Sequence, residues 1–164
     1  MNKLILAVLA ASIALPTHAM AAKSETKAPI VLPTPKAGKG QIVFFRPGGM
    51  GTAIKCTVRE GGKMVGRVGN KRYYVIDAEP GVHTFTAKSE KTDEVTVQVE
   101  PDETAFVKCK IAMGMMVGRP NLSPATELDF ARETKLEAMD AAKIAEEIAK
   151  DQAKAGSAAA GASN

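Results

Sequence analysis

Between residues 41 and 112 the sequence is divided into short runs of β-branched and aromatic residues, several of them ended by glycine or proline. In one run, apolar Ile54, Cys56 and Val58 alternate with polar side chains, which is the period of a half-buried strand. Because turn signals separate about seven such runs, we expect an all-β sandwich. The expected strands cover residues 41–46, 53–60, 64–68, 72–76, 82–87, 94–99 and 104–112.

One turn has a clear chemical signature. In the segment Glu79-Pro80-Gly81-Val82, proline presets the first turn angle and glycine supplies the positive φ that a type II turn requires. His83 follows directly, so we interpret Pro80, Gly81 and His83 as a turn motif and His83 as a structural histidine rather than a general base.

The N-terminus has the pattern of a secretory signal peptide. Lys3 precedes an apolar run over residues 4–15, and Pro16 and the small residues around Ala21 follow. The run is shorter than the roughly 20 residues that cross a bilayer as a helix. We therefore expect residues 1–21 to be removed, leaving no transmembrane segment in a soluble periplasmic or secreted protein.

The regions outside the strands have different compositions. Residues 22–40 contain Pro29, Pro33 and Pro35 and predict a flexible linker before a sandwich domain over 41–130. Residues 131–154 predict a C-terminal helix outside the sandwich, and the Ala/Gly/Ser-rich residues 155–164 predict a disordered tail. Residues 114–118 are a candidate eighth strand, and Ser123 followed by Pro124 is a candidate helix start.

The expected C-terminal helix has only a thin apolar stripe. Three arrangements stay open: docking on the sandwich, pairing with another chain, or fraying. The stripe consists of Ala141, Ile144, Ala145 and Ile148.

Cys56 and Cys109 both lie on the inward phase of their expected strands. In an oxidising compartment two facing cysteines form a disulfide where their Cα atoms approach within about 7 Å. The alternative is two buried thiols that act as small apolar side chains.

The charges argue against nucleic-acid binding. The formal net charge of +4 comes from the segments before Gln41, the chain has no tryptophan, and 4% of its residues are aromatic. Such a domain lacks the broad basic surface and stacking platforms that nucleic acids need.

Charge is nevertheless divided along the sequence. Residues 46–72 contain seven basic residues and one acidic residue, whereas residues 73–103 contain eight acidic and two basic residues. If these segments occupy different faces, the basic one offers a site for an acidic envelope protein or anionic envelope component. If their strands interleave, the charges form cross-strand pairs. The candidate binding residues are Arg46, Arg59, Arg67 and Arg72.

No pattern of an enzyme is present: the sequence has no G-x-S-x-G element and no phosphate-binding G-K-[ST] loop. We expect no catalytic residue, metal ion or cofactor. One alternative uses Met113, Met115 and Met116, whose soft sulfur atoms suit copper(I), in a periplasmic metal-handling or small-ligand carrier protein.

Three strings carry a family resemblance: QIVFFRPGGMG, VREGGKMVGRVGNKRYYVI and AEPGVHTFTAKS. Over residues 40–111 the chain resembles domain of unknown function 2846, found in bacterial secreted proteins and lipoproteins. The resemblance implies an immunoglobulin-like β-sandwich in the cell envelope, with no known enzymatic activity. No cysteine near Ala21 is available to take a lipid. Together these features predict a non-enzymatic binding or accessory module of the envelope.

Overall fold

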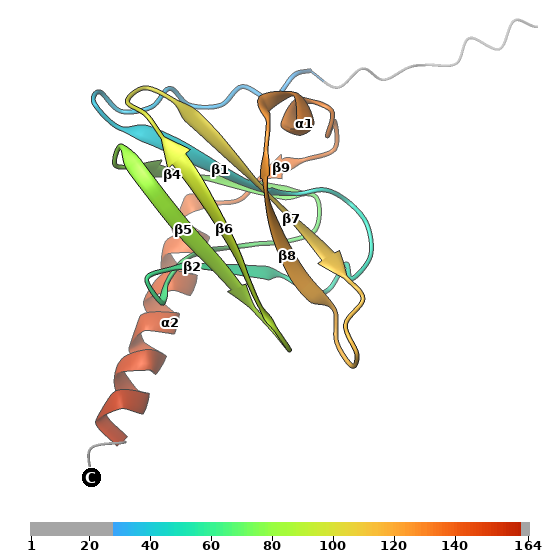
Figure 1. Ribbon diagram of the computed structural model, residues 1–164, viewed down its shortest axis with the longest axis vertical. Coiled ribbons are helices and arrows are strands. Elements are labelled where there is room, and N and C mark those ends of the chain that lie inside the picture. Colours follow the sequence, from blue (N-terminus) through green and yellow to red (C-terminus); the bar gives the residue numbers. More distant parts are fainter. Residues whose placement is uncertain (1–27, 162–164) are drawn as a thin grey trace, which may run out of the picture.

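The computed structural model describes residues 28–161 and shows two packed sheets with helices outside them (Figure 1). The expected signal peptide, residues 22–27 of the expected linker and residues 162–164 lie outside the described residues. The strands are β1 (Gly40–Arg46), β2 (Cys56–Glu60), β3 (Lys63–Val68), β4 (Arg72–Ala78), β5 (Gly81–Lys88), β6 (Thr92–Val99), β7 (Thr104–Ala112), β8 (Arg119–Ala125) and β9 (Glu137–Ala138). The helices are α1 (Glu127–Ala131) and α2 (Ala141–Gly161).

The all-β sandwich that the turn spacing predicts is confirmed. One sheet has the order β8-β7-β1-β4-β9 and the other β3-β2-β5-β6. The central strand β1 pairs antiparallel with β4 and parallel with β7, and every one of its residues is buried. Each of the seven expected strands is present in β1 to β7, with ends shifted by up to three residues.

The main core lies between the sheets. The Phe44 ring stacks on Tyr74 and meets the Phe85 ring edge-on, with centroids 5.1 and 4.9 Å away. Cys56 of β2 and Cys109 of β7 form a disulfide that joins the two sheets, with their Cα atoms 6.7 Å apart. The structure therefore has the first of the two arrangements that the sequence left open for these cysteines.

A second apolar cluster lies on the opposite face of β1. Val43 and Phe45 point away from the main core and pack with Phe130 of α1 and with Leu136. Ile30 and Leu32 also pack against this cluster. This outer covering explains why β1 is buried on both faces. In a sheet with one face open to solvent, buried and exposed residues would alternate along the strand.

Residues 28–39 differ from the flexible linker that the prolines predict. The buried Gln41 side chain donates a hydrogen bond from Nε2 to the Pro33 carbonyl, at 2.8 Å, and another to Thr104 Oγ1. With Ile30 and Leu32 packed on the second cluster, residues 28–33 form a strap along the sandwich. The apolar contacts of this strap offset the conformational entropy that is lost when residues 28–33 become ordered. The composition of the segment does not reveal these contacts.

The C-terminal elements begin later than expected. Ser123 and Pro124 belong to β8, so the helix start proposed there is wrong. Proline fits because β8 is an edge strand and pairs only with β7. Helix α1 starts after Thr126, which forms a capping box with Asp129. The Thr126 hydroxyl accepts a hydrogen bond from the Asp129 N–H, and the Asp129 carboxylate accepts one from the Thr126 N–H.

The long helix α2 starts at Ala141, not residue 131, and continues through residues 155–161, where disorder was expected. Asp140 caps it by accepting from the Ala142 N–H at 2.8 Å. Of the three arrangements left open, docking on the sandwich is observed, because α2 contacts β3. Within residues 28–161, no helix is long and apolar enough to cross a bilayer.

Candidate functional site

The four candidate arginines do not gather on one exposed surface. Arg46 is 1% exposed, and its guanidinium donates to the backbone carbonyls of Ile54, Met50 and Gly51. It therefore holds the β1–β2 loop and offers no surface to a partner. The other three lie apart: Arg72 at one side of the five-stranded sheet, and Arg59 and Arg67 on the sheet that α2 covers.

Arg59 and Arg72 bind acids that come from beyond Phe130, whereas Arg67 donates a hydrogen bond to Thr57 Oγ1 at 2.9 Å. Arg59 makes a two-pronged ion pair with Asp151 of α2, at 2.5 and 2.7 Å, and Arg72 pairs with Glu137 at 2.5 Å. The hydrogen bond from Arg59 holds the pKa of Asp151 below its ordinary value, and the nearby Arg67 charge adds to the effect. Lys55 pairs with Glu147 of the same helix at 3.2 Å.

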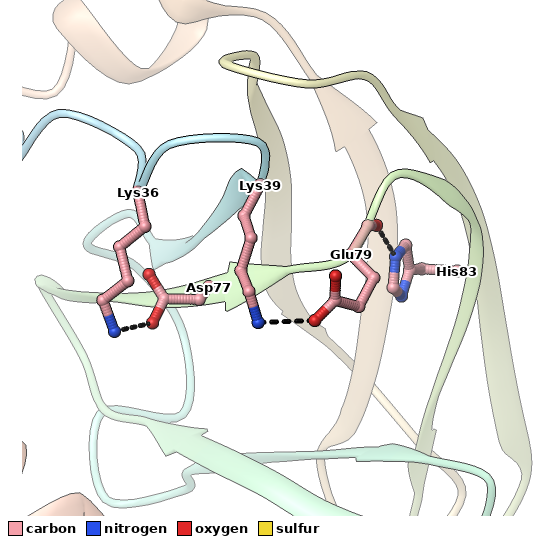
Figure 2. Close-up of polar contacts among 5 residues, drawn as sticks. All are labelled: Lys36, Lys39, Asp77, Glu79 and His83. Carbon is pink, nitrogen blue, oxygen red and sulfur yellow. Dashed lines mark hydrogen bonds and ion pairs between the residues drawn. The ribbon is translucent and has the colours of Figure 1, made fainter.

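The acidic segment is met by the N-terminal residues instead. Lys36 pairs with Asp77 and Lys39 with Glu79, each at 2.5 Å, as Figure 2 shows. Among described residues, no ion pair joins residues 46–72 to the acids of residues 73–103. The strands of the two segments do interleave, because β2 pairs with β5, but the contact of His83 with Glu60 is the one ion pair between the segments among the described residues.

The turn motif is structural. Gly81 has a φ of +143°, as the turn chemistry requires. His83 Nδ1 lies 2.7 Å from Glu60 Oε1, and Nε2 lies 2.7 Å from the Glu79 carbonyl oxygen (Figure 2 shows the second contact). Burial alone lowers the pKa of His83, but the Glu79 carbonyl and the Glu60 carboxylate outweigh it and raise this pKa. With both ring nitrogens occupied, His83 links two turns.

The described residues form a groove of about 1150 Å³ at the α1 end of the sandwich. Both edge strands next to it contribute: residues 96–98 of β6 and Pro124 and Ala125 of β8. The strap forms another wall with Ile30 and Leu32, and α1 closes the end with Phe130.

The groove has an apolar floor and an acidic rim. Its lining, as far as the described residues form it, includes three carboxylates, Glu103, Glu127 and Glu133, and no lysine, arginine or histidine. Gln41 positions the strap wall through its bond to Pro33, and the same amide reaches Thr104 of β7. A groove of this kind fits an elongated ligand with apolar groups and positive charge.

The three methionines lie on one loop, the β7–β8 connection, where Met113, Met115 and Met116 are 71, 92 and 91% exposed. The candidate eighth strand over 114–118 is wrong: the strand begins at Arg119. His83 lies near the start of β5, whereas the methionine loop contacts Glu90, just beyond the other end of β5. His83 and the three methionines are therefore separated by the length of this strand. The described part of the chain holds no cluster of three His, Cys, Asp or Glu side chains suited to a metal.

Sequence reasoning missed the groove because its lining comes from five separate stretches of the sequence: 28–33, 41, 96–98, 103–106 and 124–134. One local signal was available: Thr126 and Asp129 have the spacing of a capping box, which marks the start of α1. The apolar Ile30 and Leu32 within the proline-rich segment were a second signal, since a solvated linker has little use for large apolar side chains.

Neither a curated protein nor a solved structure was found to match this chain. The family described as Protein of unknown function (DUF2846) matches residues 36–120, a stretch that includes β1 to β7 but not α1 or α2. Because this match covers more than half of the 164 residues and agrees with the resemblance in the sequence, the chain belongs to the DUF2846 family.

Proposed function

We propose that this protein is a non-enzymatic binding module of the bacterial cell envelope, which holds an extended basic segment of another envelope protein in the groove. The observation that carries the proposal is the lining of this groove of about 1150 Å³. Its apolar floor contains Phe106 and Phe130, and the charged side chains that the described residues contribute are three glutamates.

The shape of the groove supports an extended occupant. Residues 96–98 belong to β6, which pairs with a strand on one side only in the described structure. An edge strand offers backbone N–H and C=O groups to a peptide that adds as a further strand, and neighbouring pockets select its side chains. The rim carboxylates then favour lysine or arginine at positions that alternate with apolar residues.

The experiment uses the chain from Ala22 onward, the mature form that the signal pattern predicts, and a labelled library of nine-residue peptides. Peptides that alternate Val or Leu with Lys are compared with peptides in which Glu replaces Lys, by fluorescence anisotropy. We expect binding of the basic set only, and amide NMR shifts at residues 30–32 and 96–98.

Variants at the rim test the charge argument. Glu127→Lys with Glu133→Lys is expected to weaken the basic peptides by about tenfold or more. Glu146→Lys is the matched control, because Glu146 is an exposed acid on α2 that pairs with Lys150 and does not line the groove. Absence of peptide binding, or equal binding of both peptide sets, overturns the proposal.

A further inference from the structure

The loop between β7 and β8 presents an apolar tip to solvent. Val117 is 54% exposed and follows the three methionines, of which Met115 and Met116 are more than nine-tenths exposed. We call Met113, Met115, Met116 and Val117 the methionine tip. Contiguous exposed apolar side chains are unusual on a soluble domain and mark sites of interaction.

This tip is held in one conformation by a carboxylate. Glu90, from the β5–β6 turn, accepts hydrogen bonds from the backbone N–H groups of Met115, Met116 and Val117, at 2.9, 2.7 and 3.0 Å. These bonds hold the pKa of Glu90 below its ordinary value. The loop's donors are thereby satisfied by the protein, so its side chains can leave water without exposing unpaired backbone groups.

Basic side chains border the tip. Arg119 donates to the Met113 carbonyl at 3.4 Å, and Lys91 adjoins Glu90 in the chain and lines a small hollow together with Arg119. Lys88, at the end of β5, is exposed in the same hairpin. The neighbouring Asp93 accepts from the Leu122 N–H and from Asn121, so its carboxylate is bound to β8.

We propose that the methionine tip inserts into the surface of an anionic lipid bilayer. Unbranched methionine side chains fit the irregular boundary between headgroups and acyl chains, and lysine and arginine beside them bind lipid phosphates. The residues of the tip line neither the groove nor the small hollow beside Arg119, so an extended surface such as a bilayer suits them better than a small enclosed ligand.

The position of the tip agrees with this role. It connects the last residue of β7 to the first of β8, whereas the groove is lined by the opposite ends of these strands. Figure 1 shows the β7–β8 loop and α1 at opposite ends of the hairpin. A nine-residue β7 separates them by roughly 25 Å. With the tip on a membrane, the groove faces away from it.

The test uses the chain from Ala22 onward, which retains every described residue, with a fluorescent reporter at the tip. Because the sequence contains no tryptophan, Met115→Trp introduces a single reporter. We expect a blue shift of its emission, and quenching by brominated acyl chains, on adding vesicles of phosphatidylethanolamine and phosphatidylglycerol. Val82→Trp is the matched control: Val82 is 68% exposed but lies at the start of β5, away from the tip, and is expected to show neither effect.

Sedimentation with the same vesicles measures the partition coefficient of the protein between water and membrane, and it needs no fluorescent reporter. Met115→Ser with Met116→Ser is expected to lower the partition coefficient by about tenfold, and Val82→Ser to leave it unchanged. Phosphatidylcholine vesicles are expected to bind the unmodified protein several-fold more weakly. Equal sedimentation of the unmodified protein and the double serine variant, or no response of the Met115→Trp reporter, overturns the proposal. The tip variants are expected to keep the peptide affinity of the groove, so the two proposals fail separately.

Discussion

At the scale of single residues, one tight constraint in the core is the meeting of Gly66 of β3 and Tyr74 of β4. A Cβ atom at position 66 would overlap the Tyr74 ring, so glycine is required for the two sheets to approach here. The Tyr74 ring stacks on Phe44, yet its buried hydroxyl has no hydrogen-bond partner among the described residues. Its burial raises the pKa of Tyr74 far above the ordinary value.

Tyr74→Phe is therefore expected to preserve or increase stability. The change keeps the ring stack and removes a buried polar group whose desolvation costs about 1–3 kcal/mol. Urea denaturation should show a free energy of unfolding unchanged or higher by about 1 kcal/mol. Tyr73→Phe, at a partly buried neighbouring position, is the control. A loss of more than about 1 kcal/mol for Tyr74→Phe alone would mean that the hydroxyl has a partner.

His83 makes folding stability depend on pH. Because the folded state raises the pKa of His83, its stabilising contribution is complete below the unfolded pKa of about 6.5 and disappears as pH rises through the folded value. We expect the stability difference between the unmodified protein and His83→Gln to decrease between pH 5.5 and 8.5. Chemical denaturation at several pH values measures it, and a difference that grows with pH contradicts the assignment.

At the scale of elements, the two ends of the chain neutralise the divided charge of the sandwich. Lysines before β1 meet the acids at the end of β4, and acids of α2 meet the basic residues around β2. The docked face of α2 includes partly buried Ile144 and Ile148 together with the paired Glu147 and Asp151. Because half of the docked face is polar, the apolar stripe of α2 is too thin to predict docking by itself.

Asp151→Asn tests whether this pairing docks the helix. The change removes the charge that the Arg59 fork binds, and a two-pronged carboxylate contact is among the stronger surface interactions. Amide hydrogen exchange in residues 148–155 is expected to become about tenfold faster. Glu146→Gln, which breaks the exposed pair with Lys150 on the same helix, is expected to leave exchange nearly unchanged. Equal exchange in both variants would show that apolar contacts alone dock α2.

At the scale of the whole molecule, the disulfide is the covalent link between the sheets. It closes a loop with a sequence separation of 53, which in the chain-entropy model stabilises the fold by about 4 kcal/mol. Cys56→Ala with Cys109→Ala is expected to lower the free energy of unfolding by about that amount. A reducing agent should destabilise the unmodified protein similarly and leave the double variant unaffected. No effect of reduction on the unmodified protein would contradict the link.

The sequence by itself determined the strands from residue 40 to residue 112 and the sandwich that they build. Period-two alternation and turn residues such as Pro80 and Gly81 act within a few positions, so these signals are readable without tertiary contacts. The inward phase of Cys56 and Cys109 indicated a possible pair for the same reason. The family membership follows from this same region.

Only the tertiary structure decided the groove, the pairing of charges and the methionine tip. Arg59 meets Asp151 across 92 positions of sequence, and Glu90 bonds to the loop of Met115 across 25. Local propensity carries no information about which distant side chains meet, because that depends on how the sheets pack and where the chain ends return. The strap is the clearest case: its prolines indicate a solvated linker, but burial of Ile30 and Leu32 on Phe130 and its neighbours orders it as a wall of the groove.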